Sequence, residues 1–139
     1  MLMVFFGEYE MTLTSGTRLV LPKKVREAIG GNEFVLTKGF DMCLFGYGVG
    51  DWHQRSAEFM SRSLIDTEQL GIRRMIFSGA VYIKYDEQGR FVLPKPLSMY
   101  AQIQDSVVIA GVGDHFEIWG AEQWKKYLNS AQKIVEHKS

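Results

Sequence analysis

Apolar and polar residues alternate over short stretches of this chain, and the stretches recur. Arg18–Lys23 (RLVLPK) reappears as Arg90–Lys95 (RFVLPK), at an offset of 90 − 18 = 72 residues. The same offset relates three further pairs: Val35 and Val107, Gly39 and Gly111, and Trp52 and Trp124. Because one constant offset covers so much of the chain, we infer two tandem copies of one structural unit.

Each copy has the pattern of a small β-rich unit. A polar turn precedes an alternating strand that ends at a proline, and a short amphipathic stretch and two strands joined by a glycine-containing turn follow. In the second copy, Asp86–Gly89 lies between the predicted strands Val81–Tyr85 and Arg90–Leu93 and has the Asp and Gly of a hairpin connection. Gly111–Asp114 predicts another hairpin near the end of this copy.

Helical periodicity appears between the two copies and after the second. Asp51 is placed to cap one helix, and Asp66 or Thr67 to cap another. The apolar positions of these two helices include Trp52, Phe59, Met60, Leu70 and Phe77. In the last helix they fall at three- and four-residue steps: Trp124, Tyr127, Leu128, Ala131, Ile134 and Val135. We interpret all these stripes as packing surfaces.

The length of the chain sets how the copies combine. With 139 residues, 46% of them apolar, the chain can build a buried core. One copy of about 45 residues buries too little surface alone, so the two should share one core, as the subunits of a dimer do. We predict a β-rich α+β fold with repeat 1 (8–54), a helical insert (55–79), repeat 2 (80–125) and a C-terminal helix and tail (126–139).

Cysteine, histidine and aspartate residues predict no disulfide, metal site or catalytic site. Cys43 is the single cysteine and lies in an apolar run, which favours core packing, and the histidines have no metal-ligand spacing. Asp41 and Asp114 lie in strand turns, where aspartate usually bonds the backbone. Because no serine elbow, zinc pattern or phosphate loop occurs, we expect no enzyme, no cofactor and no small-molecule substrate.

The apolar stretches of the sequence are short. None approaches the roughly 18 apolar residues that cross a bilayer, and the run Met1–Phe6 is too short for a signal peptide. We therefore expect a cytoplasmic protein without a membrane partner. Met1–Phe6 has two interpretations, a contact between subunits or an edge strand.

Basic residues gather in the first copy although the whole chain is neutral, with 16 Lys plus Arg and 16 Asp plus Glu. Arg18, Lys23, Lys24 and Arg26 crowd one short segment, with Lys38 in the same repeat. Such a cluster can neutralise DNA phosphates, and an arginine on a hairpin can pair with guanine in the major groove. A solvated basic surface explains the charges equally well.

Several motifs occur in a fixed order from about Gly7 to Leu128. They are Gly7–Tyr9, Arg18–Pro22, Leu36–Phe45, Arg73–Ala80, Asp86–Arg90 and Gly111–Trp119. Together they resemble the MraZ family. The resemblance implies two swapped-hairpin repeats of the SpoVT-AbrB class that form a pseudo-dimeric barrel.

The resemblance also implies a function. Members of this family are regulators that bind their own promoter ahead of division and cell-wall genes, and they assemble into closed rings. For this chain it implies a nucleoid-associated repressor that binds double-stranded promoter DNA as a ring of identical subunits.

The family signature is Asp-x-x-x-Arg in each repeat, with the arginine facing DNA. Asp86 and Arg90 match it, but in the first repeat Thr14 replaces the aspartate before Arg18, and Gly16 comes one position early. A carboxylate can aim the arginine through charge-assisted hydrogen bonds, whereas Thr14 offers only a hydroxyl. The implied DNA-binding residues are Arg18, Arg90, Lys23, Lys24, Arg26 and Lys95, with Asp86, Gly89 and Thr14 supporting the motif.

Two alternatives stay open. An AbrB-like antitoxin or a protein-binding adaptor could use the same barrel, because a fold does not fix a function. Two copies in one chain disfavour the antitoxin, which usually joins one copy to a toxin-binding tail. Arg73 and Arg74 on the insert could contact DNA or form salt bridges on the helix surface.

Overall fold

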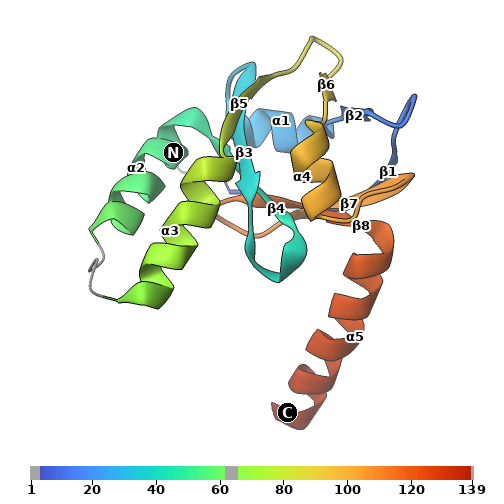
Figure 1. The fold of residues 1–139 in the computed structure, drawn as a ribbon. Helices are drawn as coiled ribbons and strands as arrows, with labels where there is room; N and C mark the ends of the chain where they lie inside the picture. Colours follow the sequence, from blue (N-terminus) through green and yellow to red (C-terminus); the bar gives the residue numbers. More distant parts are fainter. Residues whose placement is uncertain (1–3, 62–65, 139) are drawn as a thin grey trace.

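The first repeat forms its strands and short helices in the predicted order. The computed structural model describes residues 4–61 and 66–138 (Figure 1). The elements are β1 (Glu8–Thr12), β2 (Arg18–Val20), α1 (Lys23–Ile29), β3 (Glu33–Lys38), the 3₁₀ turn η1 (Phe40–Met42) and β4 (Leu44–Gly48). Pro22 ends the strand stretch and occupies the cap position of α1, where its missing N–H costs nothing.

The second repeat has the same order and follows two helices, α2 (Val49–Met60) and α3 (Thr67–Gly79). Its elements are β5 (Val81–Lys84), β6 (Arg90–Val92), α4 (Lys95–Tyr100), β7 (Ser106–Gly111), β8 (Phe116–Gly120) and the final helix α5 (Ala121–Lys138). The predicted mixed α+β class is confirmed, and the sheets consist of antiparallel pairs.

The strand order shows that the two repeats exchange strands. The larger sheet has the order β1-β7-β8-β4-β3-β5, and β2 pairs with β6 in a separate two-stranded ribbon. Strand β1 of the first repeat pairs with β7 of the second, while β5 of the second pairs with β3 of the first. Read from either edge, the sheet therefore has the same order of equivalent strands, so it is symmetric with respect to exchange of the two repeats.

The prediction of a hairpin around Asp86–Gly89 is wrong in one respect. The turn forms, but its flanking strands do not pair with each other, because β5 joins β3 in the large sheet and β6 joins β2 in the ribbon. Ile83 and Phe91 both bury their side chains in the shared core from these separate positions. The second predicted hairpin is confirmed, since β7 and β8 pair on either side of the turn at 111–115.

The core contains apolar side chains of both repeats. Phe34 of β3 packs edge-on against Phe91 of β6, with ring centroids 5.2 Å apart, and against Phe116 of β8 at 5.5 Å. Each such buried ring contributes about 1.5–3 kcal/mol relative to exposure. Gly46 of β4 lies where any Cβ would collide with the Phe116 ring, so the crossing of β4 and β8 requires glycine there. The core is thus shared between the repeats, as the length of one copy requires.

Helices α2 and α3 cover the other face of the sheet beside β3 and β4 (Figure 1). Trp52 and Ile76 from these helices are buried with Cys43, which confirms the core position of that cysteine. Burial raises the pKa of the Cys43 thiol far above its ordinary value, so the thiol stays protonated. The Thr37 hydroxyl of β3 donates a hydrogen bond to the Ile76 carbonyl of α3 and ties the insert to the sheet.

The two predicted helix caps have different outcomes. Asp66 caps α3, and its carboxylate accepts hydrogen bonds from the amides of Glu68 (3.0 Å) and Gln69 (3.4 Å). Asp51 does not cap α2, because the helix begins earlier, at Val49. Asp51 lies in the first turn instead, where its charge still complements the helix dipole.

The apolar stripe of α5 is only partly a packing surface. Trp124 and Tyr127 pack near Trp119 of β8, with ring centroids 5.3 and 4.9 Å from that indole. Beyond them the helix leaves the body of the molecule (Figure 1), and Ile134 and Val135 are exposed. The prediction of a packing surface along the whole helix is wrong for these last turns, because amphipathic spacing does not tell whether the covering partner belongs to the same chain.

Three further expectations concern the remaining surface. Residues 1–3 of the apolar run Met1–Phe6 lie outside the described residues, whereas Phe5 is buried and bridges Gly113 beside the β7–β8 turn. Asp114 of that turn forms ion pairs with Arg55 and His115, and among the described residues its carboxylate accepts no backbone hydrogen bond, contrary to the usual role of turn aspartates. Within residues 4–61 and 66–138, every helix is too short or too polar to cross a bilayer.

Candidate nucleic-acid interface

The β2–β6 ribbon turns one face toward solvent and the other into the core. Leu19 and Phe91 point inward and are only 1% and 4% exposed. The residues on either side of them alternate outward, so four side chains make up the solvent face of the ribbon. These are Arg18, Val20, Arg90 and Val92, which we call the ribbon face.

The strand register brings the two arginines onto this one face. Arg18 lies opposite Val92, and Val20 lies opposite Arg90. Arg18 and Arg90 are therefore diagonal neighbours on the two strands, with Cα atoms roughly 7–8 Å apart. The two signature arginines are 72 residues apart in the sequence (90 − 18 = 72), yet they form one cationic pair that contains one member from each repeat.

Asp86 holds the turn before Arg90 with its side chain. One carboxylate oxygen accepts hydrogen bonds from the amides of Gln88 (3.0 Å) and Arg90 (2.9 Å), and the other accepts from Arg90 Nε at 2.7 Å. Two hydrogen bonds hold the pKa of the Asp86 carboxyl below its ordinary value: the bond from the Arg90 amide has the larger effect, and the bond from the Arg90 guanidinium comes next. Asp86 therefore orients Arg90 through a charge-assisted hydrogen bond, as predicted for a carboxylate at this position.

Gly89 completes this turn. Its φ of 85° lies in the left-handed region, and an added Cβ would come within 2.7 Å of the Leu21 carbonyl oxygen. Both the backbone angle and the close approach of the other repeat therefore require glycine at this position.

The turn before Arg18 is held by backbone atoms only. The Thr14 amide donates to the Arg18 carbonyl (2.9 Å), and the Thr14 carbonyl accepts from Arg18 (3.0 Å). Ser15 and Gly16 take positive φ angles of 55° and 72°, so Gly16 supplies the left-handed angle one position early, as predicted. Within the described residues, the Arg18 guanidinium has no hydrogen-bond or ion-pair partner.

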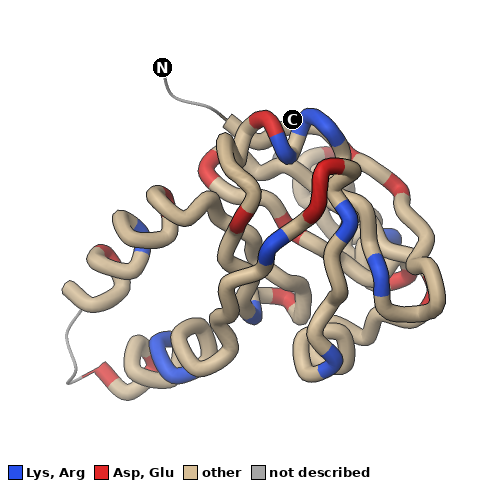
Figure 2. The backbone as a smooth tube through the Cα atoms, turned by 90° about the horizontal axis from the view of Figure 1, so that it is seen from above, with Lys and Arg blue, Asp and Glu red and all other residues tan. Residues whose placement is uncertain are grey.

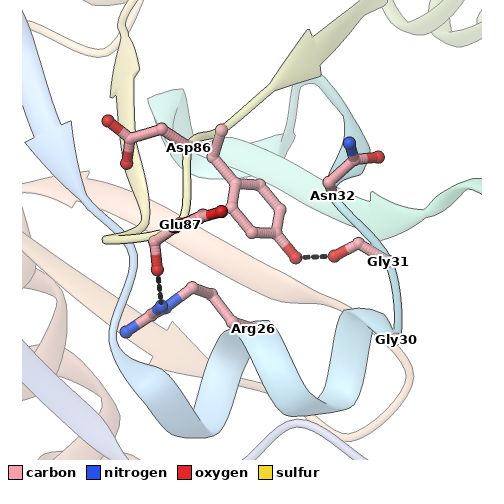
Figure 3. A pocket seen from close by; sticks show the side chains of 7 residues that line it. Arg26, Gly30, Gly31, Asn32, Asp86 and Glu87 are labelled. Carbon is pink, nitrogen blue, oxygen red and sulfur yellow. Dashed lines mark hydrogen bonds between the residues drawn. The ribbon is translucent and has the colours of Figure 1, made fainter.

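Arg26 connects the first repeat to the turn of the second. Its Nε donates to the Leu21 carbonyl (3.1 Å), and Nη1 donates to the Glu87 carbonyl (3.0 Å). Figure 3 shows the side chain rising from α1 toward Glu87, in the same turn as Asp86. Two of its three guanidinium nitrogens are thus used inside the protein. Sequence reasoning grouped Arg26 with the DNA contacts because the spacing of basic residues says nothing about nearby carbonyls.

Three predicted lysines lie at the ends of short helices beside the ribbon. Lys23 and Lys24 begin α1, and Lys95 begins α4; all three are exposed, and no ion pair joins them to other described residues. A cation gains nothing from a helix N-terminus, whose partial charge is positive. Their charges are therefore free to meet an anionic partner.

Other basic residues lie elsewhere. Lys38, at the far end of β3, has its ammonium 5.3 Å from the centre of the Tyr100 ring. Arg73 and Arg74 are on α3, and neither forms an ion pair with another described residue. Figure 2 looks down on the end of the molecule that carries the β5–β6 connection, and it shows Lys and Arg interspersed with Asp and Glu. The cationic character of the site thus depends on a few positions and not on a large basic surface.

Val20 and Val92 are the members of the ribbon face that sequence reasoning did not identify. The signal was present in the sequence, because each valine lies two residues after a charged arginine and therefore on the same face of the strand. They were missed because only the basic residues of these strands were considered as DNA contacts. Within the described residues, no group of three or more His, Cys, Asp or Glu side chains is arranged to hold a metal ion.

Known proteins resemble this chain over almost its full length. A family described as "MraZ protein, putative antitoxin-like" matches residues 4–75 and again residues 76–139. The protein named transcriptional regulator MraZ from Roseiflexus castenholzii is 37% identical, over 96% of this chain and 98% of that protein. The proteins of the same name from Lactiplantibacillus plantarum and Acetivibrio thermocellus are 39% and 35% identical, over 89% and 96% of this chain and 87% and 95% of their own lengths.

The two matches of the family model meet between residues 75 and 76, inside α3 and shortly before β5, so each match contains one of the two sets of strands. The names of the relatives describe regulators and no enzyme, in agreement with the prediction that this chain is not an enzyme. The extent of the family match and the identity over nearly the whole length lead to one conclusion: the chain belongs to the MraZ family.

Proposed function

We propose that this protein is a DNA-binding transcriptional regulator and that the ribbon face is its contact with double-stranded DNA. The observation that carries the proposal is the pairing of Arg18 and Arg90 on one solvent-exposed face. The names of its relatives support the same function. A two-stranded antiparallel ribbon fits the major groove, where arginine can make paired hydrogen bonds to guanine.

The residues around the ribbon divide into roles. Arg18 and Arg90 contact base edges, and Lys23, Lys24 and Lys95 contact phosphates on either side. Asp86 and Gly89 fix the turn that aims Arg90, whereas Thr14 leaves Arg18 freer to move. The guanidinium nitrogen Nη2 of Arg26 has no partner among the described residues, so the predicted DNA contact of Arg26 would use this atom.

Assembly is part of the proposal. A neutral chain with few basic groups binds DNA weakly, but a closed ring of identical subunits presents the ribbon face several times and turns weak contacts into strong binding. We propose such a ring, built from subunits in which the exchanged repeats form a pseudo-dimeric barrel. The ring binds repeated sites in its own promoter and is associated with the nucleoid. There it represses the division and cell-wall genes downstream.

A gel-shift titration with DNA from upstream of the gene tests the proposal. Arg18→Ala and Arg90→Ala should each weaken binding about tenfold, since a good arginine–guanine pair is worth about 1–3 kcal/mol. Arg74→Ala removes an exposed arginine from α3 and serves as the matched control. Lys23→Ala should weaken binding to all sequences alike and reduce the salt slope by about one. Unchanged binding by the double arginine variant would contradict the ribbon as the site.

The antitoxin or adaptor function is the second candidate, and the words "antitoxin-like" in the family description favour it. In that case the ribbon face would bind a protein. Wild-type protein would then leave its upstream DNA unshifted, and a small toxin gene would lie beside its own gene.

A further inference from the structure

We propose that Val20 and Val92 contact the 5-methyl groups of thymines in the major groove and so help to select the DNA sequence. This inference rests on the proposed function, since it names what the other half of the ribbon face recognises. The ligand is a thymine base edge in duplex DNA, next to a base contacted by arginine.

The exposure of the two valines is the first observation. Val20 is 36% exposed and Val92 is 56% exposed, while their neighbours Leu19 and Phe91 already fill the core beneath the ribbon. The outer positions of a ribbon are ordinarily polar, because one face of such a strand pair meets water. Packing within the chain therefore does not account for apolar side chains here.

The register is the second observation. Each valine lies directly opposite one arginine, Val92 opposite Arg18 and Val20 opposite Arg90. Directly opposite residues have Cβ atoms about 4.5–5.5 Å apart, and base pairs follow one another at about 3.4 Å, so the side chains of one pair are close enough to contact the same base step. The ribbon face thus consists of two arginine–valine pairs related by the exchange of the repeats.

Each pair combines two kinds of contact that read different bases. Arginine donates two hydrogen bonds to the O6 and N7 atoms of guanine, and an apolar side chain packs against the methyl group of thymine. The charge of the arginines identifies the occupant of this apolar surface as DNA, because an apolar protein segment would leave the Arg18 guanidinium without an anion and Arg90 with Asp86 alone. The pairs therefore favour sites in which guanine and thymine are neighbours.

Methyl-free DNA provides the test. Upstream DNA is prepared in two forms with the same sequence and charge, one with thymine and one with deoxyuridine at every thymine position. Each lost methyl–valine contact should lower affinity roughly fourfold, so with two contacts the wild type should bind the deoxyuridine form about sixteenfold more weakly. The Val20→Ala, Val92→Ala double variant should bind both forms equally, at about the affinity of the wild type for deoxyuridine DNA.

Two control variants separate recognition from folding. Val20→Thr with Val92→Thr keeps the branched shape and strand preference but replaces one methyl of each valine, so it should keep the fold and lose part of the preference for thymine. Val112→Ala changes an exposed valine in the β7–β8 turn and should leave the preference as in the wild type. Thermal unfolding of each variant verifies that the ribbon is intact.

The outcomes distinguish the thymine contact from the proposed DNA-binding function on which it rests. Equal binding of wild-type protein to both DNA forms would overturn the thymine contact and leave the proposed regulator in place. A preference for thymine that persists in the alanine double variant would also overturn it, because the methyl groups would then act through DNA shape. Failure of the wild type to bind either form would remove the proposed function together with the inference.

Discussion

In the turn before Arg90, a carboxylate accepts two backbone amides and the guanidinium itself, whereas in the turn before Arg18 only backbone atoms hold the chain. The two arginines nevertheless occupy equivalent places on one ribbon. The difference therefore lies in how firmly each side chain is aimed. Arg90 is already oriented in the free protein, whereas in the proposed DNA complex Arg18 would lose its freedom on binding, which costs about 0.5–1.5 kcal/mol for such a side chain.

The same contrast extends to the support beneath the turns. Arg26 of the first repeat donates to the Glu87 carbonyl in the turn of the second. The equivalent position in the second repeat is Ser98, whose hydroxyl bonds the Ile103 carbonyl of its own repeat (3.5 Å). Backbone bonds support both turns across the repeats, from Leu21 to Gly89 and from Leu93 to Thr17, but only the turn of the second repeat also receives a side chain of the other repeat. A duplicated chain can keep one firmly held arginine and one adaptable arginine in a single site.

The largest expected effect is on the unfolding free energy, and it distinguishes Gly89 from Gly16. Gly89→Ala forces a side chain into a left-handed backbone angle and against the Leu21 carbonyl, and it should destabilise the fold by about 3 kcal/mol. Gly16→Ala meets the same backbone strain but open space, and about 1 kcal/mol is expected. Denaturant unfolding of both variants measures the difference. Equal losses would mean that the close approach of the repeats at Gly89 contributes nothing.

The next effect concerns the connection between the repeats. Arg26→Met keeps the aliphatic part of the side chain but removes both donors, leaving the Leu21 and Glu87 carbonyls without them, and we expect a loss of about 1–2 kcal/mol in unfolding free energy. Ser98→Ala at the equivalent position is the matched control and should cost less than about 1 kcal/mol. If Arg26→Met unfolds like the wild type but binds DNA more weakly, Arg26 acts as a DNA contact and not as a support.

Much of this asymmetry was visible in the sequence, and the reasons for the remainder are physical. The chemistry of Asp86 and Thr14 predicted which turn would be held by a side chain, because a hydrogen bond four residues away is a local feature. Alternation likewise predicted the strands, and the size of one copy predicted a shared core. Local patterns carry this kind of information reliably.

The pairing of strands could not be predicted in the same way. Alternation in β5 and β6 shows that both are strands but does not name their partners, which are β3 and β2, many residues away. The role of Arg26 depends on a carbonyl of the other repeat, and the exposed end of α5 depends on what covers it. Each of these features is set by contacts between distant segments, which a periodic pattern does not record.

A smaller effect is expected when the better turn is transferred. Thr14→Asp with Thr17→Gly gives the first turn the aspartate and glycine of the second, so Arg18 should become oriented as Arg90 is. Promoter affinity should rise about threefold, since part of the entropy lost by Arg18 is then lost before binding. The reverse change, Asp86→Thr, should lower affinity by a similar factor. A transferred turn that leaves affinity unchanged would show that the orientation of Arg18 does not limit binding.

The smallest effect should appear in the dependence of stability on pH. Hydrogen bonds from Arg90 lower the pKa of Asp86 in the folded state below its ordinary value of 3.8. A carboxyl with a depressed folded pKa stabilises the fold above the unfolded pKa, and this contribution is lost as the pH falls through the folded value. The difference in unfolding free energy between wild type and Asp86→Asn should therefore be constant from about pH 7 to 5 and shrink below about pH 4. Thr14→Asn, at the equivalent position without a carboxylate, should show a difference that does not change with pH, and a difference for Asp86→Asn that grows toward low pH would contradict the role of the charge.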